Sequence, residues 1–153
     1  MSNYQIDDID RRILSFLVKD ARMAYLEIAR ECGISGAAIH QRIRKLEANG
    51  VITGSRLLVK PSALGLNVCA FVSISISQAD KYLDVTESLK KIPEVVETHF
   101  TLGAYTMMVK LYAKDDKDLM HLLNDLIQEI PGVANTETLT CLDQKINRTL
   151  PVE

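Results

Sequence analysis

The chain lacks any run of apolar residues long enough to cross a membrane. No window of its 153 residues approaches the ~20 consecutive apolar residues that a transmembrane helix needs. The N-terminus has no basic region followed by an apolar stretch, so we expect no signal peptide. With 47% hydrophobic and 25% charged residues, the composition is that of a folded protein rather than a disordered one. We therefore expect a cytoplasmic protein with no membrane partner.

Cysteine is scarce and follows no pattern. Cys32, Cys69 and Cys141 are an odd set, lie far apart in the sequence and include no CxxC pair. This excludes a disulfide framework and offers no metal-ligand spacing. We interpret all three as small apolar packing residues in a reduced compartment.

The residue arrangements that catalysis needs are also missing. The three histidines are isolated, and no Ser/His/Asp, Cys/His or HExxH arrangement or Gly-rich phosphate loop occurs. The acids Asp115, Asp116 and Asp118 suggest a metal site at first sight, but acids at a helix start ordinarily cap the helix and complement its dipole. We therefore predict neither an enzyme nor a metal or cofactor site.

Positive charge is concentrated in one short segment. The whole chain carries 18 Lys and Arg against 20 Asp and Glu. Residues 36–60 nevertheless have Glu47 as their one acid. The basic residues of that segment are Arg42, Arg44, Lys45, Arg56 and Lys60. Such a local basic surface is the electrostatic footprint expected of a nucleic-acid-binding protein.

The first twenty residues predict an amphipathic helix. Apolar side chains at Ile6, Ile9 and Ile13 recur at helical steps. Asp7 or Asp8 is expected to cap its N-terminus, because a carboxylate there accepts a hydrogen bond from a free backbone N–H group.

Two further helices joined by a tight turn predict a helix-turn-helix motif. The second helix is expected over 25–32 and ends at Gly33, as helices commonly end at a glycine. Ser35 is expected to cap a third helix. The expected buried stripe of that helix is Ile39, Ile43 and Leu46.

Residues 51–59 are expected to form a wing, with two short extended pieces that turn at Gly54. A connector with Pro61 and Gly65 follows, and the residue pattern then changes. We therefore expect a winged helix-turn-helix domain over 1–54, a connecting strand or linker over 55–66 and a second domain over 67–153.

The second domain has the order strand, helix, strand, strand, helix, strand. The expected strands are 68–77, 95–102, 105–112 and 133–142, and the expected helices are 79–92 and 115–130. The side chains expected to face inward are Leu83, Val85 or Thr86, Leu89 and Ile92 in the first helix, and Leu119, Leu122, Leu123, Leu126, Ile127 and Ile130 in the second. This order predicts an α+β fold, the ferredoxin-like βαββαβ sandwich.

An internal repeat supports these boundaries. Residues 91–95 (Lys-Ile-Pro-Glu-Val) and 129–133 (Glu-Ile-Pro-Gly-Val) occupy matching positions, each ending a helix and starting a strand. The repeat indicates a duplicated strand–helix–strand unit.

The expected strand 105–112 is apolar on both of its alternating faces. Helices cover only one face of such a sheet, so the other face needs a second protein surface. The alternative is an ordinary strand with some exposure. We predict a homodimer that packs sheet against sheet.

The third helix has an outward face suited to a major groove. Its small N-terminal residues allow close approach of the backbone to bases. Gln41 can offer two hydrogen bonds to adenine, and Arg42 or Arg44 can bind guanine or phosphate. The alternative is an ordinary solvated helix face. The expected DNA-binding residues are Ser35, Gly36, Ala37, Ala38, His40, Gln41, Arg42, Arg44, Lys45 and Arg56.

The residues of this chain resemble the Lrp/AsnC (feast/famine) regulators over nearly the whole length and in the right order. The similarity to the asparagine-type branch is greatest at 24–25, 39–40 and 52–56. The resemblance is carried by Ile9-Asp10-Arg11-Arg12-Ile13-Leu14, Asp20-Ala21-Arg22, Ile34-Ser35, Arg42-Ile43-Arg44-Lys45-Leu46-Glu47, Gly50-Val51-Ile52, Leu102-Gly103-Ala104-Tyr105 and Thr136-Glu137-Thr138.

The resemblance implies a winged helix-turn-helix joined to a ferredoxin-like, RAM-type domain that binds a small effector, typically an amino acid. It also implies dimers formed by paired sheets, which assemble into an octamer. Double-stranded DNA and the effector are the implied partners, and no cofactor is implied. The effector is expected between subunits, near Thr101, Leu102, Gly103, Ala104, Tyr105, Thr106, Thr136, Glu137 and Thr138.

This sequence departs from the family pattern in two places. Gly36 stands where many members have proline after the cap serine, which leaves the start of the recognition helix less rigid. Ala104 and Thr106 stand where many leucine-type members carry acids, so a charge-assisted bond to an ammonium group is missing. Either backbone carbonyls and Glu137 replace it, or the ligand is different. The alternative interpretation of 102–106 is a simple hairpin turn with an unusual backbone angle at Gly103.

We therefore expect a sequence-specific transcriptional regulator. Its dimers would place two recognition helices in successive major grooves, and an effector bound between C-terminal domains would change how dimers associate. Two alternatives stay open: a nucleoid-associated DNA-packing protein without an effector, and an amino-acid-sensing regulator of an enzyme.

Overall fold

The computed structural model describes residues 4–152. The chain divides into two compact units: residues up to Leu58 and from Ile146 onward form the first, and Val59–Lys145 form the second. This grouping differs at the C-terminus from the expected domains 1–54, 55–66 and 67–153. The last residues lie with the first unit, where the Thr149 hydroxyl donates a hydrogen bond to the Val18 carbonyl oxygen (3.4 Å).

The first unit contains the three predicted helices, α1 (Asp8–Leu17), α2 (Tyr25–Cys32) and α3 (Gly36–Ala48). Asp7 is the N-cap of α1. Its side chain accepts a hydrogen bond from the Asp10 N–H (2.8 Å), and the Asp10 carboxylate accepts one from the Asp7 N–H (3.3 Å). This reciprocal pair satisfies two N–H groups that a helix start leaves without partners.

The turn between α2 and α3 forms as predicted. Gly33 ends α2 with a φ of +68°, a left-handed conformation that glycine adopts without steric cost. Ser35 caps α3 by accepting a hydrogen bond from the Ala38 N–H (3.1 Å). The buried residues shared by the three helices are Ile13, Ile28, Ala29, Cys32, Ile39, Ile43 and Leu46.

The predicted wing strands are not formed. Val51 and Ile52 both donate backbone hydrogen bonds to the Leu46 carbonyl oxygen (2.9 and 3.2 Å). Among the described residues, no strand is assigned between 51 and 60, and residues 53–60 are exposed. A strand needs a neighbouring strand for its backbone groups, and among the described residues no strand pairs with this segment.

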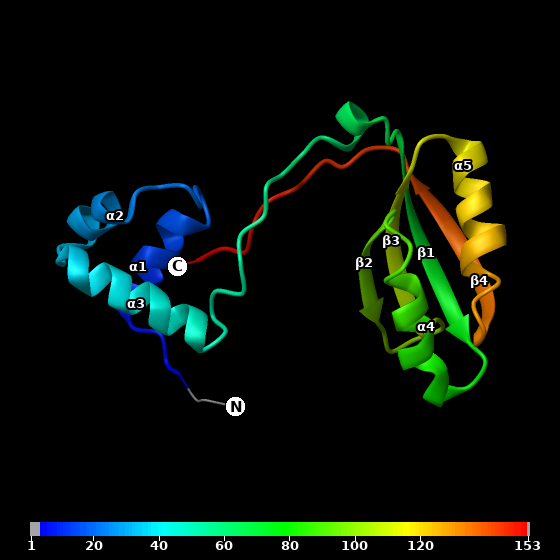
Figure 1. Ribbon diagram of the computed structural model, residues 1–153, viewed down its shortest axis with the longest axis horizontal. Coiled ribbons are helices and arrows are strands. Elements are labelled where there is room, and N and C mark those ends of the chain that lie inside the picture. The colour runs from blue at the N-terminus through cyan, green and yellow to red at the C-terminus, as the bar shows by residue number, and fades with distance from the viewer. Residues whose placement is uncertain (1–3, 153) are drawn as a thin grey trace. The chain divides into compact units, whose positions relative to one another are not determined.

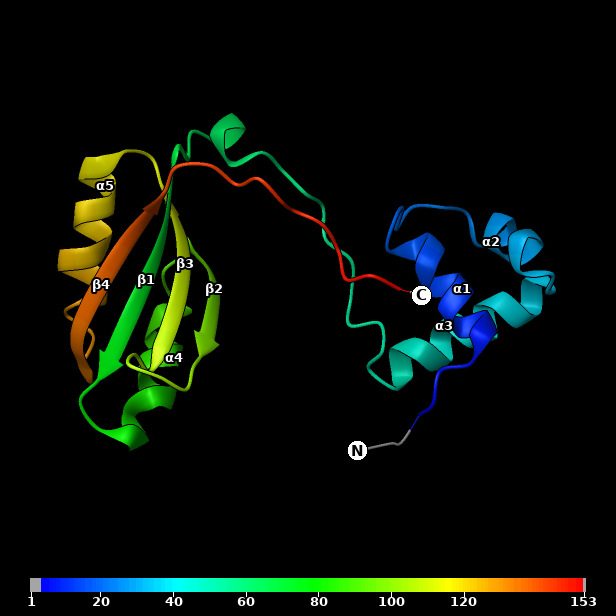
Figure 2. The same ribbon diagram turned by 180° about the vertical axis from the view of Figure 1, so that it is seen from behind.

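The second unit is the predicted α+β sandwich. Its four strands are β1 (Val68–Ile76), β2 (Val95–Phe100), β3 (Met107–Ala113) and β4 (Val133–Cys141), and its helical segments are η1 (Pro61–Leu64), η2 (Ala79–Lys81), α4 (Tyr82–Leu89), α5 (Asp116–His121) and η3 (Leu122–Ile127). The antiparallel sheet has the order β2-β3-β1-β4. Both α4 and α5 lie on one side of it, in front in Figure 1 and behind in Figure 2.

The register places the core on the face that α4 and α5 cover. Ala70, Val72 and Ile74 on β1 are completely buried. They pair with Leu111, Val109 and Met107 on β3, which are also buried. Side chains alternate along a strand, so Cys69, Phe71, Ser73 and Ser75 belong to the opposite, uncovered face.

Two helices differ in detail from their predicted form. The segment 79–92 begins with the 3-10 turn η2 and continues as α4, and Leu83 is exposed rather than inward. The segment 115–130 passes from α5 into the π-helical turn η3, where the Gln128 N–H donates to the Leu123 carbonyl oxygen (2.9 Å). This wider turn changes the helical phase, and the expected core residue Leu126 is exposed.

The internal repeat is confirmed. Ile92 and Ile130 are both buried, and their carbonyl oxygens accept hydrogen bonds from Val95 N–H (3.1 Å) and Val133 N–H (3.0 Å). These bonds lead directly into β2 and β4. The two copies differ at Gly132, whose φ is +105°.

The acidic group at the start of α5 has the predicted capping role. Asp115 accepts a hydrogen bond from the Asp118 N–H (2.8 Å), and Asp118 accepts one from the Lys114 N–H (2.9 Å). In the described part of the chain, no cluster of three potential metal ligands occurs. Within those same residues, no helix has the length and apolar character to pass through a membrane.

Candidate DNA-binding face and effector region

The outward face of α3 lies opposite its buried stripe, as predicted. Seven of the expected DNA-binding residues are exposed, and Gly36, Ala38 and Arg42 are partly buried. The exposed ones are Ser35, Ala37, His40, Gln41, Arg44, Lys45 and Arg56. The side chains on the N-terminal half of this face are small, and those on its C-terminal half carry positive charge.

Arg42 differs from the other basic residues of α3 because it is bound inside the unit. Its Nη1 donates to both carboxylate oxygens of Asp7 (2.9 and 2.7 Å) and to Asp10 Oδ1 (2.7 Å). The Asp10 side chain is only 1% exposed. The Tyr4 hydroxyl donates to the other Asp10 oxygen (2.7 Å). Arg42 therefore fastens α3 to the N-terminus of α1.

This cluster changes the acidity of its members. Hydrogen bonds from the Asp10 N–H and the Arg42 guanidinium lower the pKa of Asp7 below its usual range. The hydrogen bond to Asp10 and partial burial raise the pKa of Tyr4 to about 12. Arg42 and Asp7 therefore stay charged, and Tyr4 stays protonated, throughout the neutral range.

We expect Asp7→Asn to flatten the acid side of the stability profile. A carboxyl group whose folded-state pKa lies below its unfolded value contributes stability that is complete above the unfolded value, here 3.8, and is lost as the pH falls through the folded value. The wild-type free energy of unfolding should therefore fall more steeply below about pH 4 than that of the variant. Asparagine retains the N-cap acceptor.

Urea unfolding followed by circular dichroism at a series of acidic pH values measures this effect. Asp8→Asn is the matched control, because it removes an exposed carboxylate from the same turn. Equal acid slopes for wild type and Asp7→Asn would contradict the assigned role of the Asp7–Arg42 pair.

Two further residues of the α3 face contact neighbouring rings. His40 packs edge-on against Tyr25, with ring centroids 5.3 Å apart. Lys45 Nζ lies 4.9 Å from the centroid of the Tyr4 ring. Gly36 leaves room for α2, because a Cβ atom there would lie 2.9 Å from Leu26 Cδ2. A small residue at this position therefore accommodates the Leu26 side chain.

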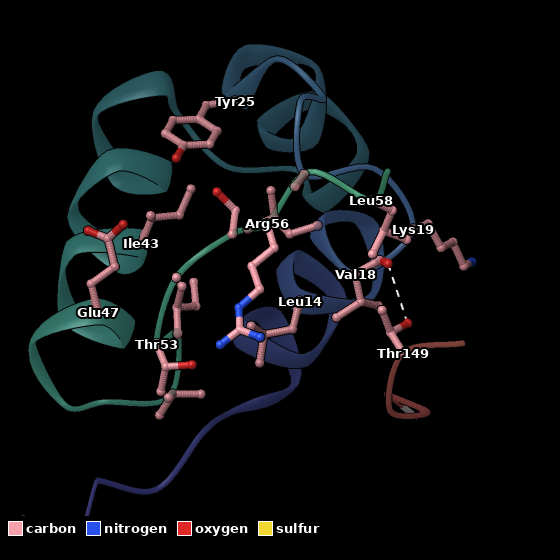
Figure 3. A pocket seen from close by; sticks show the side chains of 16 residues that line it. Leu14, Val18, Lys19, Tyr25, Ile43, Glu47, Thr53, Arg56, Leu58 and Thr149 are labelled. Carbon is pink, nitrogen blue, oxygen red and sulfur yellow. Dashed lines mark hydrogen bonds between the residues drawn. The ribbon is translucent and has the colours of Figure 1, made fainter. Parts of the chain in front are cut away.

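A pocket of about 560 Å³ lies in the first unit, among α1, α3 and residues 51–58. Leu14 from α1, Ile43 and Glu47 from α3, and the predicted DNA-binding residue Arg56 are among its lining residues (Figure 3). Its lining comes from segments far apart in the sequence, which is why no local motif indicated it.

The predicted effector loop joins β2 and β3. The Thr101 N–H donates to the Thr106 carbonyl oxygen (2.9 Å), and the Thr101 hydroxyl donates to the Tyr105 carbonyl oxygen (2.8 Å). Thr106 is tied to β1, because its N–H donates to the Ile74 carbonyl oxygen (2.9 Å) and its hydroxyl accepts from the Ile76 N–H (3.3 Å). Leu102, Gly103 and Ala104 form the exposed tip.

Gly103 does not have the unusual backbone angle considered for it. Its φ is not among the positive values of the described glycines, and a Cβ atom there would meet no atom within 4 Å. The fold of this chain therefore does not itself require glycine at the tip of the loop.

The structure brings some of the expected effector residues together and separates others. The Tyr105 hydroxyl donates to the Glu137 carboxylate, which joins the loop to β4 and raises the pKa of Tyr105. Glu137 pairs with Ser73 on the uncovered face. Thr136 and Thr138 pair with Ile74 and Val72, so they belong to the helix-covered face.

Gln128 is a residue of this region that the sequence analysis missed. Its side-chain amide donates a hydrogen bond to the Thr136 hydroxyl (3.0 Å). Gln128 directly follows the π-helical turn, and a helix of regular period was expected there. The change of phase that directs Gln128 toward β4 left no local signal in the sequence.

Comparison with known proteins identifies both units. Residues 6–47 match the AsnC-type helix-turn-helix domain, and residues 69–151 match the Lrp/AsnC ligand binding domain. The chain is 39% identical over 150 residues to the regulatory protein AsnC of Escherichia coli K12, covering 98% of this chain and 99% of that protein. It is 39% identical over 149 residues to the transcriptional regulator FL11 of Pyrococcus furiosus, covering 97% of each.

Solved structures agree with these matches. The structure of E. coli AsnC has a TM-score of 0.88 and 38% identity, covering 96% of this chain and 99% of that one. A feast or famine regulatory protein of Mycobacterium tuberculosis, complexed with L-methionine, has a TM-score of 0.90 and 27% identity, covering 97% and 100%. The helix-turn-helix unit, the β2-β3-β1-β4 sandwich and these matches over nearly the full length together show that the chain belongs to the Lrp/AsnC family of transcriptional regulators.

Proposed function

We propose that α3 reads the major groove of double-stranded DNA and that an amino-acid effector acts on the second unit. The DNA-binding proposal rests on the outward face of α3, whose side chains change from small to polar and basic along the helix. Its small residues Ala37 and Ala38 permit close backbone approach, and Gln41 and Arg44 follow on the same side. Among the described residues, neither Gln41 nor Arg44 has a hydrogen-bond or ion-pair partner in the chain.

The basic residues of α3 have different proposed roles. Arg44 and Lys45 contact DNA directly, together with Ser35 and Arg56 at its phosphates. Arg42 positions the helix instead, because its Nη1 already donates to the carboxylates of Asp7 and Asp10. Domain boundaries at 54 and 67 would leave residues 55–66 as the connection between the DNA-binding and effector-binding parts.

The uncovered face of the sheet is the proposed dimer interface. Leu139 is 62% exposed and Met108 is 42% exposed, and Phe71 and Tyr112 lie on the same face. Lys110 Nζ is near the Phe71 and Tyr112 rings (5.9 and 5.8 Å) and pairs with Glu97 (3.3 Å). A second copy would remove this apolar surface from water. We further propose that such dimers assemble into an octamer in the cytoplasm.

The class of effector follows from the M. tuberculosis relative, which is complexed with L-methionine. In this chain, the loop Thr101–Thr106 and residues 136–138 are the proposed binding region. Glu137 is the carboxylate available to an ammonium group, because Ala104 and Thr106 carry none. Thr106 already accepts a hydrogen bond from the Ile76 N–H (3.3 Å), which leaves its hydroxyl proton for a ligand.

Fluorescence anisotropy tests this function. The probes are the DNA upstream of the protein's own gene and a scrambled duplex, with and without each common amino acid, at two salt concentrations. We expect preferential, salt-sensitive binding that one amino acid alters. Equal binding to both duplexes with no amino-acid response would instead favour a DNA-packing protein, and no binding would favour an amino-acid-sensing regulator of an enzyme.

We expect Arg44→Ala and Arg42→Ala to weaken DNA binding in different ways. Loss of a phosphate contact reduces the slope of log K against log salt concentration by about one. Arg44→Ala should show that reduction. Arg42→Ala should weaken binding with an unchanged slope, because it removes the bonds that hold α3 to the start of α1 and leaves the number of phosphate contacts the same. Lys117→Ala, an exposed charge in the second unit, is the control, and wild-type binding by Arg44→Ala would contradict the proposed face.

A further inference from the structure

The pocket of the first unit is built from segments that are held in place separately. The end of α1 supplies Leu14, Leu17 and Val18. Residues 51–58 also line it, and two backbone hydrogen bonds to the last turn of α3 hold their start. Thr149 lines it from the C-terminal segment, which is fixed by the hydrogen bond to the Val18 carbonyl oxygen (3.4 Å). Every lining residue belongs to the first unit, and none belongs to the sheet face that we propose as the dimer interface.

The lining offers apolar surface that the fold of this unit leaves partly uncovered. Leu14, Leu17, Tyr25 and Ile52 pack against the helical core but are only partly buried. Ile43 of α3, which is buried, completes this apolar part of the lining. The volume of about 560 Å³ lies within the range of about 300–1,000 Å³ for small-molecule sites. An aliphatic chain placed here would remove these side chains from water.

Arg56 brings a positive charge to this apolar surface. Figure 3 shows its side chain extending from residues 51–58 over the middle of the pocket, whereas Lys19 and Glu47 lie at opposite margins. Within residues 4–152, Arg56 has no hydrogen-bond or ion-pair partner. Among the described lining residues, Glu47 is the one acid, against the two cations Lys19 and Arg56. The charge of the lining therefore favours an anion.

We propose that this pocket binds a medium-chain aliphatic carboxylate. The alkyl chain lies against the aliphatic side chains of α1 and Ile52, and the carboxylate accepts two hydrogen bonds from the Arg56 guanidinium, whose planar donors match its geometry. Because we also place Arg56 at DNA phosphates, the carboxylate and a phosphate are alternative partners of one guanidinium. The test below uses the chain without DNA, so its result does not depend on the proposed DNA binding.

Octanoate is the probe, and the full-length chain is the target. Isothermal titration measures the affinity and stoichiometry, and methyl NMR spectra of the Ile-, Leu- and Val-labelled chain locate the site. We expect saturable binding of one octanoate per chain, with shifts at the methyl groups of Leu14, Leu17 and Ile52 and none at Val72 and Leu111 of the second unit. Octylammonium has the wrong charge and acetate has no chain, so each should bind at least about tenfold more weakly.

Substitutions of Arg56 test the role of its charge. Arg56→Gln should weaken octanoate binding by about tenfold or more, since a hydrogen-bonded ion pair is lost. Arg56→Lys should give an intermediate affinity, because lysine keeps the charge but not the paired donors. Arg30→Gln is the matched control, since Arg30 is an exposed arginine of α2 outside the lining, and it should bind octanoate as the wild type does. Unchanged melting temperatures would show that the variants are folded.

Five results would overturn the proposal. They are binding of octanoate that does not saturate, equal binding of octylammonium, wild-type affinity in Arg56→Gln, and methyl shifts confined to the second unit. The fifth is binding that occurs only when the chain is diluted to a monomer, because the pocket would then be a contact between two copies of the chain.

Discussion

Leu46→Ala is expected to lower the free energy of unfolding of the first unit by about 2–5 kcal/mol, the range for removal of a buried leucine side chain. Leu46 is completely buried in the shared core of the three helices. A cavity at this position cannot collapse freely, because the Leu46 carbonyl oxygen holds the chain after α3 through Val51 and Ile52. Small domains are stable by only about 5–15 kcal/mol, so much of the unit's stability would be lost.

Hydrogen exchange measured by mass spectrometry follows the two units separately. Protection should fall in α1, α2 and α3 and should persist in β1 and β3. Leu26→Ala is the control, since it makes the same change at a side chain that is 60% exposed, and it should leave protection almost unchanged. Similar effects of the two substitutions would show that Leu46 does not anchor this core.

Gly132→Ala should be the most damaging alanine substitution at a glycine of the second unit. The φ of Gly132 is +105°, which L-amino acids rarely adopt. A Cβ atom there would also lie 3.0 Å from Lys81 Cβ and 3.2 Å from Val85 Cγ2. Backbone strain of this kind costs about 1–3 kcal/mol, and overpacking against a core residue adds to it. We expect a total loss of about 2–4 kcal/mol.

Thermal unfolding monitored by circular dichroism measures this loss. Gly103→Ala supplies the matched control, because a Cβ atom at Gly103 meets open space and its φ is not positive. Its melting temperature should equal that of the wild type. A melting temperature for Gly132→Ala as high as that of Gly103→Ala would refute the explanation from strain.

The features that the sequence predicted well are those that neighbouring residues determine. The caps Asp7 and Ser35 and the left-handed Gly33 depend on backbone groups within a few positions. The order of helices and strands along the second unit could be predicted for a similar reason. The repeat at 91–95 and 129–133 marks two positions where a helix ends and a strand begins. Local hydrogen-bonding needs therefore account for most of the element boundaries.

The features that the sequence did not predict depend on contacts between distant segments. The hydrogen bonds from Arg42 to the carboxylates of Asp7 and Asp10 were not predicted, because these acids lie more than thirty residues away in the sequence. The π-helical turn exposes Leu126, which a regular period would bury. Cys69 and Cys141 were expected only to pack, and strand register places them opposite each other. None of these outcomes follows from the spacing of residues within one element.

The last residues of the chain return to the first unit, so two separate segments of the sequence make up that unit. The chain leaves this unit after Leu58 and returns to it at Ile146, where the contact is noncovalent and includes the hydrogen bond from the Thr149 hydroxyl to the Val18 carbonyl oxygen. Removal of the residues from Ile146 onward would therefore take contacts away from the first unit, although these residues follow the second unit in the sequence. The two ends of the chain thus belong to one folded unit, and the whole of the second unit is an insertion between them.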